Sequence, residues 1–257
     1  MTCDVLLIVG GATGIGAEVV RQMTADGVRV AICDINEPAG EQLANETGSA
    51  FLPGDVADDA SLGQAIARCV ATFGVPNYAV LNSGVMTVPG DEPFQSLEEA
   101  SLSAYRRVMS VNLDGVFHGL RHLIPLMRDA PGAKSRTITV TASRAGIVPT
   151  AADVIYAASK AGVIQMVRSA AAANRKSNLR INALCPGTVD TTLIADVVRE
   201  VGVPLVSAAD MAAEIVALVR EGGNGEVRAR LHDRPAFSVG TFDSGVAYVA
   251  PVAPGAE

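Results

Sequence analysis

Short apolar runs that alternate with longer segments of helical periodicity constrain this sequence more than any other feature. Helical spacing fills the segments between the runs, as in "EVVRQMTADG" and "ADMAAEIVALVREGG", and from Leu97 to Ala130. Strands that are apolar throughout and alternate with helices are typical of a parallel sheet covered on both faces. We therefore predict an α/β fold with a doubly wound parallel sheet of about seven strands and helices on both faces. The runs expected to be strands are "DVLLIVGG", "VRVAICD", "SAFLPGDV", "NYAVLNSG", "RTITVTAS", "RINALCPG" and "EVRARL".

One domain accommodates this pattern. The chain has 257 residues, of which 49% are hydrophobic and 18% charged, and it contains no internal repeat or low-complexity linker. Residues 1–235 are predicted to form one domain with its ligand pocket. Periodicity is lost from Arg234 onwards, where Pro and Gly are frequent. Residues 236–257 are therefore predicted to be an irregular C-terminal arm or tail.

Charge and cysteine content exclude several classes of protein. The net charge of −7 and the absence of a Lys/Arg block argue against a nucleic-acid partner. No apolar run reaches the roughly 18 residues that span a membrane. The first expected strand starts at Val5, so we expect no secretory leader. The four cysteines lack metal-type spacing, and we expect reduced thiols in a cytoplasmic protein; they are Cys3, Cys33, Cys69 and Cys185.

A glycine-rich segment, "GGATGIG" at residues 10–16, separates the first expected strand from the first expected helix. Glycines at this place let the backbone turn tightly and approach a pyrophosphate, which then rests on the helix N-terminus. Glycines also serve ordinary turns, so the segment alone leaves both interpretations open.

Asp34 ends the second expected strand, 24 residues after Gly10. A carboxylate at this place can accept hydrogen bonds from both ribose hydroxyls of an adenosine. It would repel a 2′-phosphate, and the neighbouring Ile35 and Asn36 offer no compensating cation. Thr13, inside the glycine turn, is also neutral. This combination favours NAD over NADP, with a simple turn residue as the alternative interpretation of Asp34.

Two further polar residues follow expected strands. Asp55 comes after the third strand and Asn82 after the fourth. Open parallel sheets bind ligands at the carboxyl ends of their strands. Each residue taken singly is an ordinary turn residue, but together with the glycine turn they would line one crevice.

Tyr156 and Lys160 form a pair four residues apart on one expected helix. A cation beside a phenol favours the phenolate and lowers its pKa, which suits Tyr156 to take a proton from an alcohol. Ser143 ends a strand thirteen residues earlier and could hold the substrate oxygen. Asn112 lies in a long apolar helical stretch, where an amide is costly unless it is hydrogen-bonded. A satisfied core asparagine is its alternative interpretation.

These motifs together resemble the short-chain dehydrogenase/reductase family over roughly the first 225 residues. "GGATGIG" resembles the cofactor turn of that family, "GDV" its adenine-contacting acid and "LNSG" its Asn-Ala-Gly segment. Asn112, Ser143, Tyr156 and Lys160 resemble the catalytic tetrad. "CPGTVDT", residues 185–191, is similar to the segment that contacts the nicotinamide carboxamide.

The resemblance implies a Rossmann fold, an NAD cofactor and defined roles for these residues. Tyr156 would be the general acid/base, Ser143 would orient the substrate oxygen, and Lys160 would lower the tyrosine pKa and bind the nicotinamide ribose. Asn112 would hold a water that relays protons. The implied cofactor-binding residues are Gly10, Thr13, Gly14, Ile15, Gly16, Asp34, Ile35, Asp55, Val56, Asn82, Ser83, Gly84, Tyr156, Lys160, Pro186, Gly187, Val189 and Thr191.

The chain departs from the family pattern at a few places. Val9 replaces a usual Thr, Leu81 a usual Asn, and Ser83 a usual Ala. The C-terminal Asp-Gly-Gly is absent, and the ending is more like the branch with prostaglandin dehydrogenases and insect alcohol dehydrogenases. The resemblance implies a homo-oligomer. Because that terminus commonly builds one interface of the usual tetramer, its departure here leaves both a homodimer and a homotetramer open.

The expected function is an oxidoreductase that transfers a hydride between NAD(H) and a secondary alcohol or ketone. An NADPH-dependent ketoreductase and a non-catalytic NAD-binding sensor are the alternatives. The negative charge of Asp34 argues against NADPH as the cofactor. The presence of both Tyr156 and Lys160 argues against a non-catalytic sensor. The expected pocket segments, residues 145–155 and 191–206, are rich in Ile, Leu and Val, which favours an apolar substrate.

His118 and His122 have a spacing that can hold zinc. The Glu of a zinc-protease motif and a third ligand are missing, so we expect surface or interface histidines and no metal.

Overall fold

A mostly parallel sheet forms the centre of the protein, as seen in the computed structural model, which describes residues 4–88, 92, 94–132, 135–191, 193 and 202–240. In this part of the chain the sheet has eight strands in the order β3-β2-β1-β4-β5-β6-β7-β8. All neighbours are parallel except β7 and β8. The strands are β1 (Val5–Val9), β2 (Arg29–Asp34), β3 (Ala50–Pro53), β4 (Tyr78–Leu81), β5 (Arg136–Thr141), β6 (Leu179–Pro186), β7 (Val227–Leu231) and β8 (Arg234–Ser238).

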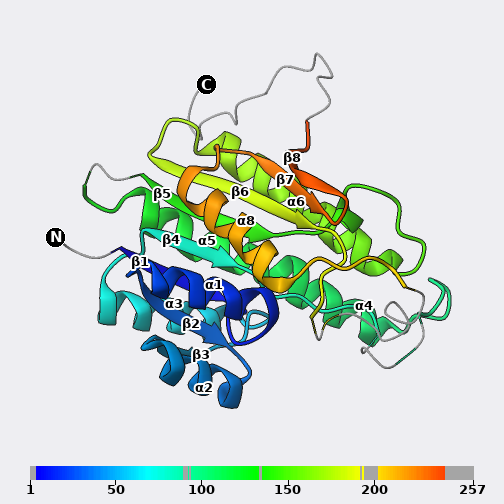
Figure 1. Ribbon diagram of the computed structural model, residues 1–257, viewed down its shortest axis with the longest axis horizontal. Coiled ribbons are helices and arrows are strands. Elements are labelled where there is room, and N and C mark those ends of the chain that lie inside the picture. The colour runs from blue at the N-terminus through cyan, green and yellow to red at the C-terminus, as the bar shows by residue number, and fades with distance from the viewer. Residues whose placement is uncertain are drawn as a thin grey trace, which may run out of the picture.

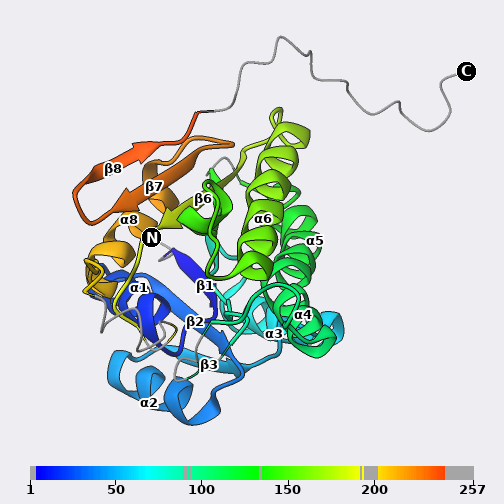
Figure 2. The same cartoon turned by 90° about the vertical axis from the view of Figure 1, so that its right-hand side faces the viewer.

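Helices cover both faces of the sheet, so the predicted α/β fold is confirmed. Figure 1 shows α1 and α8 in front of the strands, and Figure 2 shows α1, α2 and α8 on one side with α3, α5 and α6 on the other. The helices are α1 (Gly14–Ala25), α2 (Glu37–Thr47), α3 (Asp59–Phe73), α4 (Leu102–Met109), α5 (Gly115–Arg128), α6 (Val154–Ala173) and α8 (Ala208–Glu221). None of the described helices is long and apolar enough to cross a membrane.

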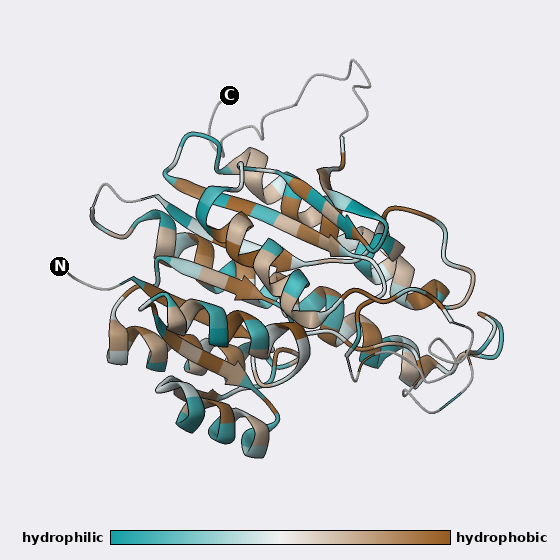
Figure 3. Ribbon diagram, in the orientation of Figure 1, coloured by the Kyte–Doolittle hydropathy of each residue, from teal (hydrophilic) through white to brown (hydrophobic). Residues whose placement is uncertain are grey.

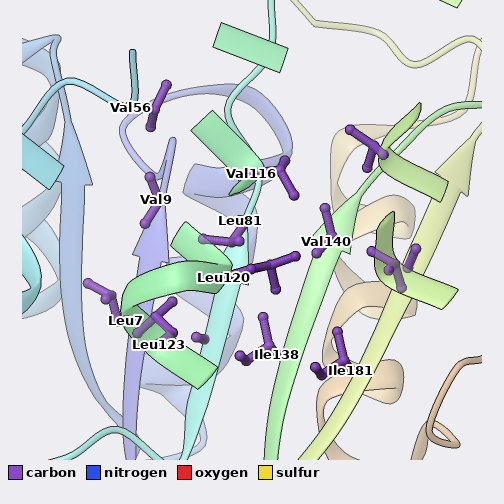
Figure 4. Close-up of a cluster of buried hydrophobic side chains, with 14 of the residues drawn as sticks. Leu7, Val9, Val56, Leu81, Val116, Leu120, Leu123, Ile138, Val140 and Ile181 are labelled. Atoms are coloured by element: carbon purple, nitrogen blue, oxygen red, sulfur yellow. The ribbon is translucent and has the colours of Figure 1, made fainter. Parts of the chain in front are cut away.

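Strand residues alternate between two apolar layers. Leu7 packs into a cluster with residues of α3, α5 and α6, whereas Leu6 and Ile8 pack into a second cluster with residues of α1 and α8. Figure 4 shows the first cluster, where Leu120 and Leu123 of α5 lie over the strands. The covering helices mix hydrophobic and hydrophilic residues along their length, as Figure 3 shows. Burial of both sheet faces explains why the strands are apolar throughout.

The order of the strands reverses beside β1. The chain runs from β1 outwards to β2 and β3, and then crosses to β4 on the other side of β1. The loops after β1 and β4 therefore diverge at the carboxyl ends of these strands. This divergence leaves a crevice, and open α/β sheets bind their ligands at such a place.

The segment from Leu97 to Ala130, expected to be helical, contains two helices joined without a loop. Residues 97–99 form a turn, α4 starts at Leu102, and a π-helical turn, Ser110–Asp114, leads directly into α5. A π-turn inserts an extra residue in a helix and rotates the side chains that follow it; such turns are frequent at functional sites.

Strand β8 differs from the predicted irregular arm. Arg234–Ser238 pairs with β7 in the antiparallel sense, with Ala229 opposite Phe237. The strand lacks an apolar run because it lies at the edge of the sheet and is largely exposed, and an edge strand also tolerates Pro235. Residues 241–257 of the predicted arm lie outside the described residues.

Truncation of a core residue tests the packing of α5 on the sheet. Leu123 is fully buried, so Leu123→Ala is expected to lower the free energy of unfolding by about 2–5 kcal/mol, through lost apolar burial and the cavity left behind. Leu102→Ala is the control, because Leu102 is 72% exposed. Urea unfolding followed by circular dichroism measures both. Equal effects of the two substitutions would contradict the packing of α5.

Candidate active site

The glycine turn after β1 brings backbone very close to backbone. Gly10 has a φ of +78° and Gly14 a φ of +54°, both in the region that favours glycine. A Cβ at Gly16 would lie 2.1 Å from the Gly10 carbonyl oxygen, and a Cβ at Gly10 would lie 2.6 Å from the Ser83 amide nitrogen. The turn therefore cannot carry side chains at these positions without moving.

Asp34, at the end of β2, lies beside this turn. Its Oδ2 accepts a hydrogen bond from the Ala12 amide at 2.9 Å, and its Oδ1 accepts one from the Asn36 amide at 3.0 Å. Each carboxylate oxygen has two acceptor sites, so both retain capacity for a further donor. The side chain is thus held in a fixed orientation next to the glycines and can still bind a ligand hydroxyl.

Asn82 ties three strand ends together. Its Nδ2 donates to the Gly10 carbonyl oxygen at 2.8 Å, and its Oδ1 accepts from the Thr141 hydroxyl at 2.9 Å. Both ends of the amide are engaged within the protein. The Asn82 side chain therefore braces the ends of β1, β4 and β5 against one another.

A cleft of about 540 Å³ runs along the carboxyl ends of the strands. Its wall includes Gly54, Thr141 and Thr188, which the sequence did not single out. Two predicted residues, Gly16 and Asn112, lie behind the wall. The predicted residues that line the cleft are Gly10, Thr13, Gly14, Ile15, Asp34, Ile35, Asp55, Val56, Asn82, Ser83, Gly84, Ser143, Tyr156, Lys160, Pro186, Gly187, Val189 and Thr191.

Three of the proposed catalytic residues converge in this cleft. Ser143 follows β5, and its side chain interacts with the Tyr156 hydroxyl closely enough to oppose the rise in the tyrosine pKa. Lys160 lies one turn further along α6; its Nζ donates to the Thr141 carbonyl oxygen at 3.0 Å and lies 5.7 Å from the centre of the Tyr156 ring. A hydroxyl, a phenol and an amine therefore line the same cleft, and such groups can exchange a proton with a bound alcohol or ketone.

Burial shifts the pKa values of the phenol and the amine in opposite directions. It raises the pKa of Tyr156 to about 12, although the Ser143 hydroxyl opposes the shift, and it lowers the pKa of Lys160 to about 8. Both shifts favour the neutral form, as expected for groups removed from water. Desolvation of the phenol dominates its pKa, and Lys160, whose Nζ donates to a carbonyl oxygen, is not among the groups that shift it; the lowering of the tyrosine pKa by Lys160 stays a prediction.

Asn112 is fully buried in the π-helical turn and has all its hydrogen bonds within the protein. Its Oδ1 accepts from the Val85 amide at 2.8 Å, and its Nδ2 donates to the Val85 carbonyl oxygen at 2.9 Å and to the Ser159 hydroxyl at 3.1 Å. Ser159 in turn donates to the Tyr156 carbonyl oxygen at 2.7 Å. The interpretation as a satisfied core asparagine describes these contacts, which join the segment after β4 to α6.

Asp153, a buried carboxylate at the start of α6, was not among the site residues predicted from the sequence. It is 3% exposed, and its oxygens accept hydrogen bonds from the Tyr156 amide at 2.9 Å and from the amide of Thr87, also at 2.9 Å, as well as from the Thr87 hydroxyl. Asp153 thus caps the helix that carries Tyr156 and anchors the loop after β4 to it. An Asp three residues before Tyr156 at a helix start was the available signal.

Cys185 was predicted only as a reduced buried thiol. Burial raises the pKa of the thiol to about 12, although the Ser143 backbone and the Lys160 cation oppose the shift. The thiol is therefore neutral and supports the loop that carries Ser143. No disulfide is formed by the described cysteines.

The two histidines of α5 contact α3 and the loop before it. His118 Nδ1 lies 2.9 Å from the Val56 carbonyl oxygen, and His122 Nε2 lies 2.9 Å from Asp59 Oδ1. In the part of the chain that the structure describes, no three His, Cys, Asp or Glu side chains come together as a metal site would require.

The expected substrate pocket is only partly described. Leu193 and Val203 line the cleft. Ile147 and Val148, which follow Ser143 closely in the sequence, are exposed. Residues 194–201 of the predicted pocket, with Ile194, lie outside the described residues.

Comparisons with known proteins agree with this geometry. Residues 4–202 match the model of the short chain dehydrogenase family. The chain is 34% identical to a 3-beta-hydroxysteroid dehydrogenase of Comamonas testosteroni, over 74% of this chain and 72% of that protein. It is also 34% identical to a cis-4-hydroxycyclohexanecarboxylate dehydrogenase of Sinomonas cyclohexanicum, over 81% of this chain and 80% of that protein.

A solved structure shares the fold. The crystal structure of levodione reductase superposes with a TM-score of 0.76 at 24% identity, covering 88% of this chain and 95% of that one. Members of the matched family use a nicotinamide cofactor, NAD or NADP. The protein is therefore an oxidoreductase that belongs to the short-chain dehydrogenase family.

Proposed function

We propose that the protein is an NAD-dependent dehydrogenase that interconverts an apolar secondary alcohol and its ketone. The observation that carries this proposal is the convergence of Ser143, Tyr156 and Lys160 in the cleft that Asp34 and the glycine turn also line. Relatives support the substrate class, since they include a 3-beta-hydroxysteroid dehydrogenase and a cyclohexanol dehydrogenase.

The cleft fits a dinucleotide at its glycine end. Because Gly14 has no side chain, a ligand can come close to the backbone of the glycine turn. A Cβ at this position would lie 3.2 Å from the Thr191 side chain and would narrow the space. The N-terminus of α1 offers backbone donors to a pyrophosphate. Asp34 would accept hydrogen bonds from the adenosine ribose and would repel a 2′-phosphate. When bound, the nicotinamide supplies or accepts the hydride.

Tyr156 would act as the general acid/base, which donates or accepts the proton in the reaction. A phenol with a pKa near 12 is protonated at neutral pH, so it is ready to donate a proton to the oxygen of a ketone. Ser143 would hold that oxygen through its hydroxyl. Asp153 fixes the first turn of α6, so the phenol keeps its place relative to Ser143. In the direction of alcohol oxidation, the same tyrosine must first lose its proton.

Removal of the phenol hydroxyl should abolish the proton transfer. Tyr156→Phe is expected to lower kcat by about 10²- to 10⁴-fold, the usual contribution of general acid–base catalysis, and to leave NADH binding within about twofold. Tyr105→Phe is the control, since Tyr105 is exposed on α4. Steady-state kinetics and NADH fluorescence measure the two effects. Full activity of Tyr156→Phe would contradict the role of this residue.

The raised tyrosine pKa makes the two directions differ in pH dependence. Because the protonated phenol persists up to about pH 12, alcohol oxidation should accelerate as the pH rises from 6 and ketone reduction should not. The rise should continue above pH 8, because the pKa of the phenol lies near 12. Profiles of kcat/KM in both directions test this. An oxidation rate that falls between pH 6 and pH 8 would contradict the assignment of Tyr156 as the base.

Asp34 should determine the choice of cofactor. Asp34→Ala is expected to weaken NADH binding by about tenfold, through loss of two hydrogen bonds to ribose, and to strengthen NADPH binding by removing a like charge. Fluorescence titration with both cofactors measures these changes. Glu37→Gln is the control, because it removes a nearby exposed carboxylate outside the cleft. If the unmodified protein prefers NADPH, the alternative of an NADPH-dependent ketoreductase replaces the proposal.

A further inference from the structure

We propose that Arg144 selects substrates that carry a carboxylate or a similar compact anion in addition to the secondary alcohol. The proposal rests on the proposed function and specifies its substrate class. The cleft wall contains Arg144 directly after Ser143 in the chain, and many of the other lining residues are apolar. A cation at this place is unexpected if the substrate is a plain hydrocarbon alcohol, because it gains nothing from an apolar ligand.

The backbone of Arg144 is fixed relative to the catalytic residues. It opens a short 3-10 turn, Arg144–Gly146, whose start is capped by the Ser143 hydroxyl at 3.1 Å from the Ala145 amide. Gly146 lies against α6, where a Cβ would come within 2.6 Å of the Lys160 backbone. Consecutive Cα atoms are about 3.8 Å apart, so one small substrate can contact both Ser143 and Arg144.

Two of the other charged groups of the cleft, Lys160 and Asp153, already have partners. Lys160 is the second cation of the described wall, and its Nζ is bonded to the Thr141 carbonyl oxygen. Asp153 is the nearest acid in sequence, and its oxygens are bonded to Thr87 and to the Tyr156 amide. Neither group offers Arg144 a partner or competes with it for an anion.

Arg144 itself keeps its donors available. It is exposed, and none of the ion pairs formed between described residues involves it. By contrast Arg107, which also lies near the loop after β4, donates to the carbonyl oxygens of Met86 and Thr87 and so has a structural role. Arg144 is therefore the guanidinium of the cleft that is open to a ligand.

The surroundings define the rest of the substrate. The lining of the cleft also includes the apolar residues Met86, Phe94, Ala152, Leu193 and Val203. A planar guanidinium beside such a surface suits a carboxylate, which it can bind through two parallel hydrogen bonds. The substrate class is thus an apolar hydroxy acid, with the carbinol oxygen at Ser143 and Tyr156 and the carboxylate at Arg144.

Matched pairs of substrates test the proposal. Each pair consists of a neutral alcohol and its carboxylate analogue, beginning with cyclohexanol and cis-4-hydroxycyclohexanecarboxylate, and kcat/KM is measured with NAD. The unmodified enzyme should prefer the carboxylate. Arg144→Met should lower kcat/KM for the carboxylate by about 10- to 100-fold, mainly through KM, because a hydrogen bond to a charged group is lost. The neutral alcohol should change by less than about twofold.

Two further variants serve as controls. Arg144→Lys should restore part of the preference, since it keeps the charge and loses the paired geometry. Arg106→Met removes an exposed cation of α4 that does not line the cleft, and it should leave kcat/KM for both substrates unchanged. A loss of equal size with Arg106→Met would show a general effect of surface charge and overturn the proposal.

A binding measurement separates this proposal from the proposed function. Cyclohexanecarboxylate lacks the hydroxyl and cannot react, so calorimetry in the presence of NADH reports the anion site alone. Binding of cyclohexanecarboxylate that Arg144→Met weakens by tenfold or more supports the anion site. If in addition none of the alcohols turns over, only the proposed function is overturned. Two results would overturn the anion site and leave the proposed function intact. One is turnover of neutral alcohols without a preference for the carboxylates, and the other is binding of cyclohexanecarboxylate that Arg144→Met does not weaken.

Discussion

The hydrogen bonds of the Asn82 side chain hold together the three strand ends on which the cleft depends. The strand order reverses between β1 and β4, so the loops that follow them separate and leave a crevice. Asn82 bridges that divergence by donating to the Gly10 carbonyl oxygen and accepting from the Thr141 hydroxyl. The glycine turn on one side and the loop of Ser143 on the other therefore keep a fixed separation.

Buried polar groups then fix the catalytic helix against this frame. Asp153, Asn112 and Lys160 are almost inaccessible to water, and each would be costly without its partners. Together they join the segment after β4 and the end of β5 to the first turns of α6. A cleft built in this way is rigid along one wall, which suits a reaction in which a proton and a hydride must reach neighbouring atoms.

Much of the fold and the site followed from local patterns. All seven expected strands are present, and the central ones, such as β1, leave a clear pattern because a strand buried on both faces is apolar throughout. Strand β8 was missed because one exposed edge strand needs no such pattern. Asp153 was missed because its Asp-x-x-Tyr spacing is common at helix starts, and its second contact, with Thr87, lies 66 residues away. The net rise in the pKa of Tyr156 was not foreseen, because burial cannot be read from a four-residue spacing.

The sequence by itself determined which chemistry this protein carries: a glycine turn before a helix, an acid after the second strand, and a phenol and an amine on one helical face. These are local features, set by residues a few positions apart, so they can be recognised without a structure. Only the tertiary structure decided how that chemistry is tuned. Desolvation, the bonding of Lys160 to the Thr141 carbonyl oxygen and the placement of Arg144 in the cleft all depend on residues that meet across the sheet, and distance in space is not encoded in spacing along the chain.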